Sequence, residues 1–304
     1  MGDGPAVKAV LDGKVAVVSG SGQSVGRAIA VLMAAEGARV VVNSRSEVSR
    51  DSTPTARDTA RIIQDQGGEA TVVYADVSTS AGGRALVEAG YEAYGSVDIL
   101  VNNAGGDRVI PIAEMTDEDW AGQIALNLTS QFICTRAAVP GMRERGWGRI
   151  INLTSRGGIY GMPAMSAYAA SKMGTLGFTT SVARELLGTG ITVNALAPLA
   201  DTVRMERSRE GMLAATGRSM FAAHPALTPD HVAPIAVYLA SEAAASVTGQ
   251  TFFAAAGAIA RYEVPFVDST LYKSGMWSAA ELTDAFPAAF GTSLEPMDMP
   301  PTPT

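Results

Sequence analysis

Tyr168 and Lys172 have the types and the spacing of a pair that moves protons. They lie four residues apart in the stretch SAYAASKMG, within a helix predicted over about 166–188, so their side chains share one face. A free tyrosine has a pKa of about 10, which is too high for an efficient base near neutral pH. A cation beside the phenol favours the phenolate. We therefore expect Lys172 to lower the pKa of Tyr168, so that the phenol can serve as acid and base.

A second candidate is the small-residue turn within VAVVSGSGQSVGRAIA, residues 15–30. A strand that enters a helix through such a turn presents free N–H groups and a positive dipole to an anion. Gly20 can make the sharp turn, and Gly26 can let the helix pack closely on the sheet. The spacing G-x-G-x-x-G fails because Val25 stands where the third glycine belongs. Taken alone, this turn is as compatible with a purely structural role as with phosphate binding.

These residues need a scaffold in which strands and helices alternate, and the sequence predicts one. Apolar strand runs cover 14–20, 38–44, 69–77, 97–106, 148–155, 190–198 and 249–257. Helices are predicted over 25–36, 56–68, 80–94, 117–145, 166–188 and 228–241, the last with Thr228 as its cap and Pro234 as a candidate kink. Buried parallel strands are apolar on both faces. The expected fold is an α/β Rossmann-type, doubly wound sheet of seven parallel strands flanked by helices, in a single domain over 13–260.

Outside this domain, residues 1–12 are read as an N-terminal extension and 261–304 as a C-terminal tail. Its last ten residues are expected to be disordered or draped on a partner.

Three further features accompany the tyrosine and lysine in the expected order. Ser155 ends a strand thirteen residues before Tyr168, NNAG at 102–105 ends another strand, and Asn127 lies within the long helix. Together they resemble the short-chain dehydrogenase/reductase family over about residues 12–257. The resemblance implies that Tyr168 is the acid/base and that Lys172 lowers its pKa and holds the ribose of a nicotinamide cofactor. It also implies that Ser155 binds the substrate oxygen and that Asn127 holds a water linked to Lys172.

The family's nucleotide turn, T-G-x-x-x-G-x-G, falls on Ser19, Gly20, Ser24 and Gly26. Ser24 replaces a glycine and is the clearest departure. After the second strand, NAD-preferring enzymes carry an acid. This chain has Ser44 and Arg45 there, which favours NADP(H), with NAD(H) as the alternative. The resemblance places the following residues at the nucleotide: Ser19, Gly20, Ser24, Val25, Gly26, Ser44, Arg45, Asp76, Val77, Asn103, Ala104, Gly105, Tyr168, Lys172, Pro198 and Thr202. Leu199 replaces a second family glycine.

The substrate class is open between several readings. The C-terminal part resembles bacterial relatives of the dehydrogenase module of peroxisomal multifunctional enzymes, which implies a bulky, mostly apolar ketone or secondary alcohol. An NAD-dependent 3-hydroxyacyl-CoA dehydrogenase is one alternative. A nucleotide-binding regulator without catalysis is another, of a different class. Met205, Met212, Met220 and Phe221 could cover an apolar substrate or simply pack a surface segment.

Composition and sequence pattern limit the classes of partner that the protein can bind. The formal net charge of -7 argues against a nucleic-acid partner. No apolar run reaches the length of a membrane span, and neither His224 nor His231 has the company of metal ligands. We therefore expect a cytoplasmic enzyme without a metal that acts on a small-molecule carbonyl or alcohol. The family resemblance implies a homotetramer or homodimer formed through the helices at 117–145 and 166–188 and the last strand.

Overall fold

The computed structural model describes residues 9–48, 53–217, 227–263, 272–274, 276 and 278–290. The chain divides into two compact units, Met1–Arg261 and Tyr262–Thr304. The second contains helix α10 (Ala279–Phe290). The last ten residues of the chain, together with Met220, Phe221 and His224, lie outside the described residues, so the expectations for them stay predictions.

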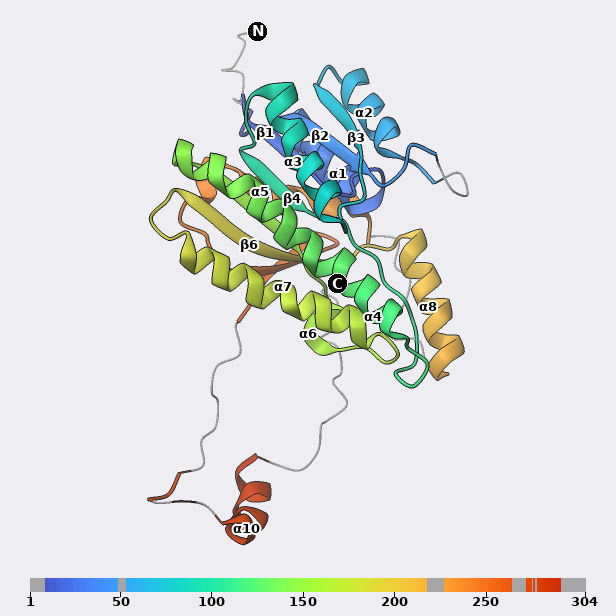
Figure 1. Cartoon of the computed structure of the whole chain (residues 1–304), viewed down its shortest axis with the longest axis vertical. Helices are drawn as coiled ribbons and strands as arrows, with labels where there is room; N and C mark the ends of the chain where they lie inside the picture. The colour runs from blue at the N-terminus through green and yellow to red at the C-terminus, as the bar shows by residue number, and fades with distance from the viewer. Residues whose placement is uncertain are drawn as a thin grey trace. The chain divides into compact units, whose positions relative to one another are not determined.

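One sheet runs through the first unit in the order β3-β2-β1-β4-β5-β6-β7-β8 (Figure 1). The strands are β1 (Val15–Val18), β2 (Arg39–Ser44), β3 (Ala70–Tyr74), β4 (Ile99–Asn102), β5 (Gly148–Leu153), β6 (Ile191–Pro198), β7 (Thr251–Ala255) and β8 (Ala258–Tyr262). The first seven pair in parallel. The order reverses between β1 and β4, which is where a doubly wound sheet opens a crevice for a ligand. The predicted fold class is confirmed.

The strand count is one higher than the seven predicted. Ala256 and Gly257 have φ values of 46° and 86°, which is the positive pair that a type I′ turn requires. Such a two-residue loop joins antiparallel strands, so β8 folds back beside β7. The predicted last strand, 249–257, ends at this turn, and an Ala-Gly pair is a weaker hairpin signal than Asn-Gly.

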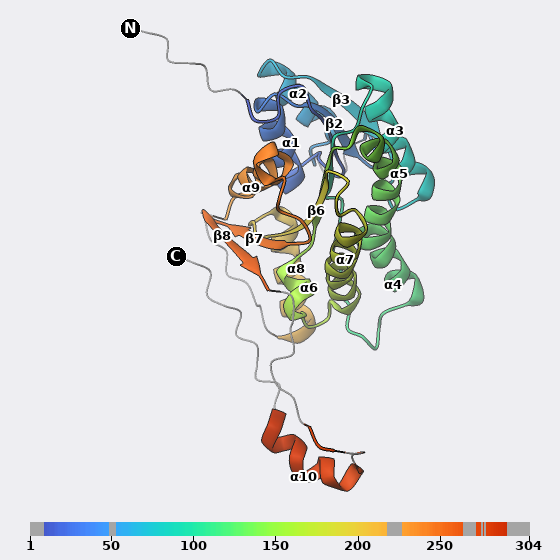
Figure 2. The same cartoon turned by 90° about the vertical axis from the view of Figure 1, so that its left-hand side faces the viewer.

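Two helical layers cover the sheet (Figure 2). Helices α1 (Ser24–Ala35), α2 (Ala56–Asp65) and α9 (Ala233–Ala240) bury apolar side chains against one face. Helices α3 (Ser80–Tyr94), α5 (Ser130–Arg145) and α7 (Ser166–Glu185) bury theirs against the other. Neighbouring strand residues divide between the layers: Val18 faces the first and Val17 the second. This two-sided burial explains the continuous apolar strand runs of the sequence.

Two predicted helices are interrupted. The helix expected over 117–145 consists of α4 (Asp117–Ile124), a π-helical turn (Ala125–Thr129) and α5. The helix expected over 228–241 begins as a 3-10 turn (Pro229–His231), and α9 follows with Pro234 in its first turn. Pro234 therefore starts a helix, where its missing N–H costs nothing, and does not kink one.

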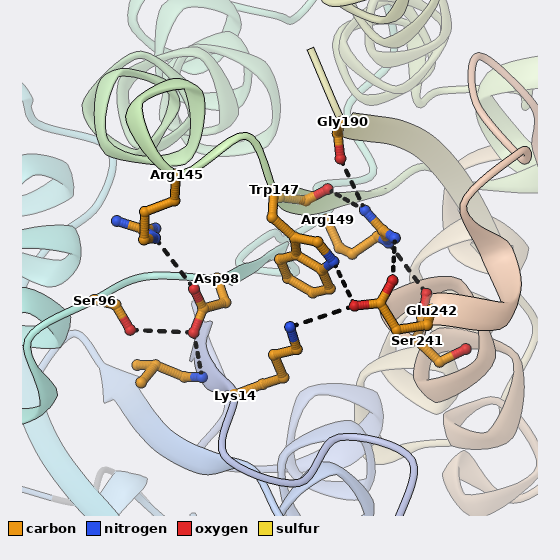
Figure 3. A network of polar contacts seen from close by, with 11 residues as sticks. Lys14, Ser96, Asp98, Arg145, Trp147, Arg149, Gly190, Ser241 and Glu242 are labelled. Carbon is orange, nitrogen blue, oxygen red and sulfur yellow. Dashed lines mark hydrogen bonds and ion pairs between the residues drawn. The ribbon is translucent and has the colours of Figure 1, made fainter. Parts of the chain in front are cut away.

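The amino ends of the strands carry a polar network centred on Arg149 (Figure 3). Arg149 is 1% exposed and donates to the carbonyl oxygens of Ser241 (3.1 Å), Gly148 (2.8 Å) and Gly190 (3.1 Å). Its guanidinium lies 4.4 Å from the centre of the Trp147 ring. Burial lowers the pKa of Arg149, and Glu242 opposes that shift. Gly148 starts β5, Gly190 precedes β6 and Ser241 caps the end of α9, so the network joins the amino ends of these strands to the end of the helix.

Candidate active site

The turn between β1 and α1 lies at the carboxyl edge and is built from closely packed backbone. Gly20 has a φ of 61°, and a Cβ there would lie 2.8 Å from the Cα of Ala104. A Cβ on Gly26 would lie 2.3 Å from Nδ2 of Asn103. Val25, in the first turn of α1, packs against the core of the first layer. Both predicted glycine roles, the sharp turn and the close packing, therefore describe this segment.

Ser19 and Asn103 connect this turn to the end of β4. The Ser19 hydroxyl accepts from the backbone N–H groups of Asn103 (2.9 Å) and Ala104 (3.0 Å). Asn103 donates in return to the carbonyl oxygens of Ser19 (3.0 Å) and Gly20 (2.9 Å). The two predicted nucleotide segments thus form one hydrogen-bonded unit across the switch point of the sheet.

Asn43 is a residue that sequence reasoning missed. It is 1% exposed at the end of β2, and its Oδ1 accepts from Gly20 N–H (3.0 Å). Its Nδ2 donates to the carbonyl oxygens of Val73 (3.1 Å) and Ala75 (3.2 Å). Asn43 therefore ties the turn to two strands. An amide side chain directly after the apolar run at 40–42, within a buried strand, was the signal that could have found it.

Ser24 stands in left-handed backbone, with a φ of 54°. This conformation explains why the family pattern has glycine here, since a Cβ makes it unfavourable by about 1 kcal/mol. The N-cap residue of α1, Gln23, makes no side-chain capping bond, and the first turn holds no acidic residue. The first N–H groups of α1 are thus left without an acidic competitor for an anion.

The residues predicted at the adenosine end lie at neighbouring strand ends. The Ser44 hydroxyl donates to the carbonyl oxygen of Ser46 (3.0 Å), while Arg45 is exposed. Asp76 follows β3 and accepts from the hydroxyl of Ser78 (2.6 Å), and Val77 is buried beside it. Neither Ser44 nor Arg45 is a carboxylate that would repel a phosphate.

Tyr168 and Lys172 lie one turn apart on α7, as predicted. The Lys172 ammonium is 5.9 Å from the centre of the Tyr168 ring and donates to the carbonyl oxygen of Leu153 at the end of β5 (2.8 Å). Lys172 is buried. The neighbouring Thr154 hydroxyl donates to the carbonyl oxygen of Lys172 (2.6 Å), which fixes α7 against the end of β5.

Burial shifts the pKa values of both members of this pair. Burial raises the pKa of Tyr168 to about 12, and neighbouring Asp107 adds to that shift. A hydrogen bond with the Ser155 side chain and the charge of Arg204 act in the opposite direction. Burial also lowers the pKa of Lys172 to about 7. In the protein without a cofactor, desolvation therefore acts against the phenolate, while the lowering of the phenol pKa expected from Lys172 beside a bound cofactor stays a prediction.

Ser155 and Asn127 approach the same place from other elements. Ser155 caps the short helix α6 (Arg156–Tyr160), accepting from Gly157 N–H (3.1 Å), and shares a hydrogen bond with Tyr168. Asn127 is fully buried in the π-helical turn and exchanges hydrogen bonds with the backbone of Gly106 (2.8 and 3.0 Å). A Cβ on Gly105 would lie 2.9 Å from Oδ1 of Asn127 and 3.3 Å from Nζ of Lys172. Asn127 and Lys172 thus meet at Gly105, and Lys172 in turn neighbours Tyr168, which is bonded to Ser155, so the four predicted catalytic residues form one cluster.

The segment between β6 and the next helix departs from the family pattern at Leu199. Pro198 ends β6, and Leu199 is buried with its N–H bonded to the carbonyl oxygen of Ala254 (3.0 Å). Thr202 caps helix α8 (Val203–Thr216) by accepting from Met205 N–H (3.2 Å). Leu199, which replaces a family glycine, therefore serves the core, and Thr202 starts the helix beside the site.

Comparison with known proteins decides the family. A family profile described as short chain dehydrogenase matches residues 14–212. The chain belongs to the short-chain dehydrogenase/reductase family. This family is one of oxidoreductases, so the predicted family and enzyme class are confirmed.

Individual relatives of this short-chain dehydrogenase cover most of its length. A 3-oxoacyl-[acyl-carrier-protein] reductase of Synechocystis is 38% identical over 245 residues, which are 80% of this chain and 95% of the relative. A monensin polyketide synthase putative ketoacyl reductase of Streptomyces virginiae is 40% identical over 250 residues, 78% of this chain and 94% of the relative. The finer resemblance to the peroxisomal dehydrogenase module stays a prediction.

A solved structure also resembles this short-chain dehydrogenase. The crystal structure of a short chain dehydrogenase from Mycobacterium avium superposes with a TM-score of 0.80 at 33% identity and covers 93% of this chain and 96% of that one. Within the part of the chain that the structure describes, no helix is long and apolar enough to cross a membrane.

Proposed function

We propose that this enzyme uses NADP(H) to interconvert a ketone and a secondary alcohol on a bulky, mostly apolar substrate, with Tyr168 as acid and base. The observation that carries the proposal is the cluster of Tyr168, Lys172, Ser155 and Asn127, at the edge where the β1–α1 turn lies. The ketoacyl reductases among its relatives act on ketones by name, which supports the same reaction class.

The pKa of Tyr168 defines how its proton moves. At about 12, the phenol is protonated near neutral pH and can give its proton to a developing alkoxide. Ser155, hydrogen-bonded to the phenol, is placed to bind the same oxygen. Lys172, whose pKa is about 7, is placed to resupply the proton of the phenol, and Asn127 would hold a water that links Lys172 to solvent.

The residues of the β1–α1 turn fit a dinucleotide. The uncapped first turn of α1 suits a pyrophosphate, and Arg45 suits a 2′-phosphate through charge-assisted hydrogen bonds. A bound nicotinamide nucleotide supplies or accepts the hydride. The preference for NADP(H) over NAD(H) rests on Ser44 and Arg45, where an acid would bind the free ribose hydroxyls of NAD.

A turnover assay tests the acid/base role. The purified enzyme is given NADPH and a panel of apolar and β-oxo ketones, and Tyr168→Phe is compared with wild type. The variant keeps the ring but lacks the proton, so we expect turnover to fall at least about 100-fold with NADPH binding retained. A non-catalytic regulator would bind NADPH without turnover in either protein. Equal turnover in both would remove Tyr168 from the mechanism.

Cofactor choice is tested with Arg45→Ala. Loss of a charged hydrogen bond of about 1.5–3 kcal/mol should raise KM for NADPH at least about tenfold and leave KM for NADH unchanged. Wild type that prefers NADH and oxidises 3-hydroxyacyl-CoA would instead support the alternative, an NAD-dependent 3-hydroxyacyl-CoA dehydrogenase.

Assembly into a homotetramer or homodimer is also proposed. Phe132 on α5 and Met173 on α7 are large apolar side chains that are 42% and 41% exposed, which suits contact between copies through these helices. Sedimentation that gives only monomer would contradict this. A cytoplasmic location stays a prediction.

A further inference from the structure

One face of α8 lies along the segment that leads from β4 to α4 (Figure 1). Arg204, Ser208 and Gly211 are spaced four and three residues apart, so they share that face. Arg204 donates to the carbonyl oxygen of Gly105, and the Ser208 hydroxyl donates to the carboxylate of Asp107. Helix and segment therefore meet in a regular register.

The third contact extends this register. A Cβ on Gly211 would lie 3.4 Å from the Cβ of Val109, at van der Waals distance, so these two residues lie side by side at the far end. Positions 204, 208 and 211 thus match positions 105, 107 and 109. The family resemblance gave no role to any of these residues except Gly105.

The near end of the register is the active site. Gly105 borders Asn127 and Lys172, and the charges of both Asp107 and Arg204 act on Tyr168 and Lys172. A shift of α8 would therefore change the electrostatic environment of Tyr168 and Lys172.

We propose that Asp107, Arg204 and Ser208 are positioning residues, and that their contacts clamp α8 to residues 105–109 so that substrate binds against a fixed wall beside Tyr168. This rests on the proposed function. It assigns roles to three side chains that touch neither cofactor turn nor reacting atoms.

The clamp also places opposite charges around the phenol. Asp107 raises the pKa of both Tyr168 and Lys172, and Arg204 lowers the pKa of both. Other charged or titratable groups stand on the same elements: Lys172 on α7, Arg156 and Tyr160 on α6, Arg108 in the segment 105–109, and Glu206, Arg207, Arg209 and Glu210 on α8. Arg156 lies 5.9 Å from the centre of the Tyr160 ring and 5.2 Å from that of Phe253.

Steady-state kinetics test the mechanical part. Ser208→Ala breaks the hydrogen bond to Asp107 and should raise KM for the ketone about fivefold or more, with kcat and NADPH affinity within about twofold of wild type. Asp107→Ala breaks the same bond and should raise KM at least as much, while it also removes the charge that acts on Tyr168. The double variant should have the same KM for the ketone as Asp107→Ala alone, because the hydrogen bond can be lost only once. If the two substitutions raised KM multiplicatively, or if neither of them changed KM, the clamp proposal would be overturned.

The pH dependence of alcohol oxidation tests the electrostatic part. Oxidation needs the phenolate, so its rate rises as pH passes the pKa of the phenol. Asp107→Asn removes a group that raises this pKa and should move the rise to lower pH. Arg204→Gln should move it to higher pH, and Arg204→Lys, which keeps the charge, should restore the wild-type profile.

Arg207→Gln is the matched control, because it makes the same charge change on an exposed side chain of the same helix. Its profile should match wild type. A purely structural role would leave all profiles alike and would overturn the proposal. Failure of the proposed function would be seen in a different comparison, because wild type and Tyr168→Phe would then turn over the ketone at the same rate. Thermal unfolding of each variant confirms that kinetics are compared on folded protein.

Discussion

Ser24 holds a conformation that its side chain disfavours, at the position where phosphate binding is proposed. Its φ of 54° lies in the left-handed region, and it is half-buried in the first turn of α1. Strained non-glycine residues concentrate at functional sites. The serine hydroxyl is an additional donor that glycine would not provide, and this gives the strained residue a chemical use.

Replacing Ser24 separates strain from binding. Ser24→Gly relieves the left-handed strain and should raise the free energy of unfolding by about 0.5–1 kcal/mol. Ser24→Ala keeps the strain and should not. If the hydroxyl contacts phosphate, both variants bind NADPH more weakly by a similar factor in a fluorescence titration. Destabilisation by glycine would contradict the strain argument.

For single residues, the sequence predicted which side chains form the site better than it predicted their pKa values. Tyr168, Lys172, Ser155 and Asn127 were found from type and spacing, because helical periodicity and strand ends determine which side chains meet. The protonation of Tyr168 and Lys172 was not, since it depends on how deeply the folded chain buries them.

At the scale of elements, the site depends on polar side chains that fasten one segment to another. Asn43 joins the β1–α1 turn to β2 and β3. The π-helical turn between α4 and α5 places Asn127 against Gly106. A π turn inserted in a helix is frequent at functional sites, because it redirects one side chain without ending the helix.

Asn43→Ala should damage both stability and cofactor binding. Three half-buried backbone groups lose a partner, so the free energy of unfolding should fall by about 1–3 kcal/mol, and KM for NADPH should rise because the turn is released from its neighbouring strands. Asn194→Ala is the control: Asn194 is equally buried but bonds to Val247 and Gln250. It should lower stability alone. An Asn43 variant with unchanged KM would contradict the fastening role.

Element boundaries show where sequence reasoning reached its limit. The strands and helices were predicted because their apolar periodicity is strong. The π turn, the start of α9 at Pro234 and the return strand β8 were not, because each depends on a local change of backbone path that leaves the apolar pattern almost unaltered. The register of α8 against residues 105–109 is tertiary and has no signal in spacing along the chain.

In the whole molecule, a network that stabilises the sheet and the residues proposed for catalysis lie at opposite ends of the strands. The Arg149 network lies at the amino ends of the strands (Figure 3). Tyr168 and the nucleotide turn lie at their carboxyl ends. Fold stability and catalysis can therefore be changed almost independently.

Arg149→Ala tests this separation. Three carbonyl oxygens lose their donor and Glu242 loses a partner, so the free energy of unfolding should fall by about 3–5 kcal/mol. Below the unfolding temperature, kcat and both KM values should stay within about twofold of wild type. A large loss of kcat in fully folded protein would show that the two edges are coupled.

The same arginine has a consequence for biosynthesis. Its acceptors include Gly190 and Ser241, so the cation leaves the ribosome long before its last acceptor is synthesised. Until then, closing the sheet would bury a guanidinium with an incomplete set of acceptors. The nascent chain is therefore expected to complete its fold only when nearly the entire catalytic unit has emerged.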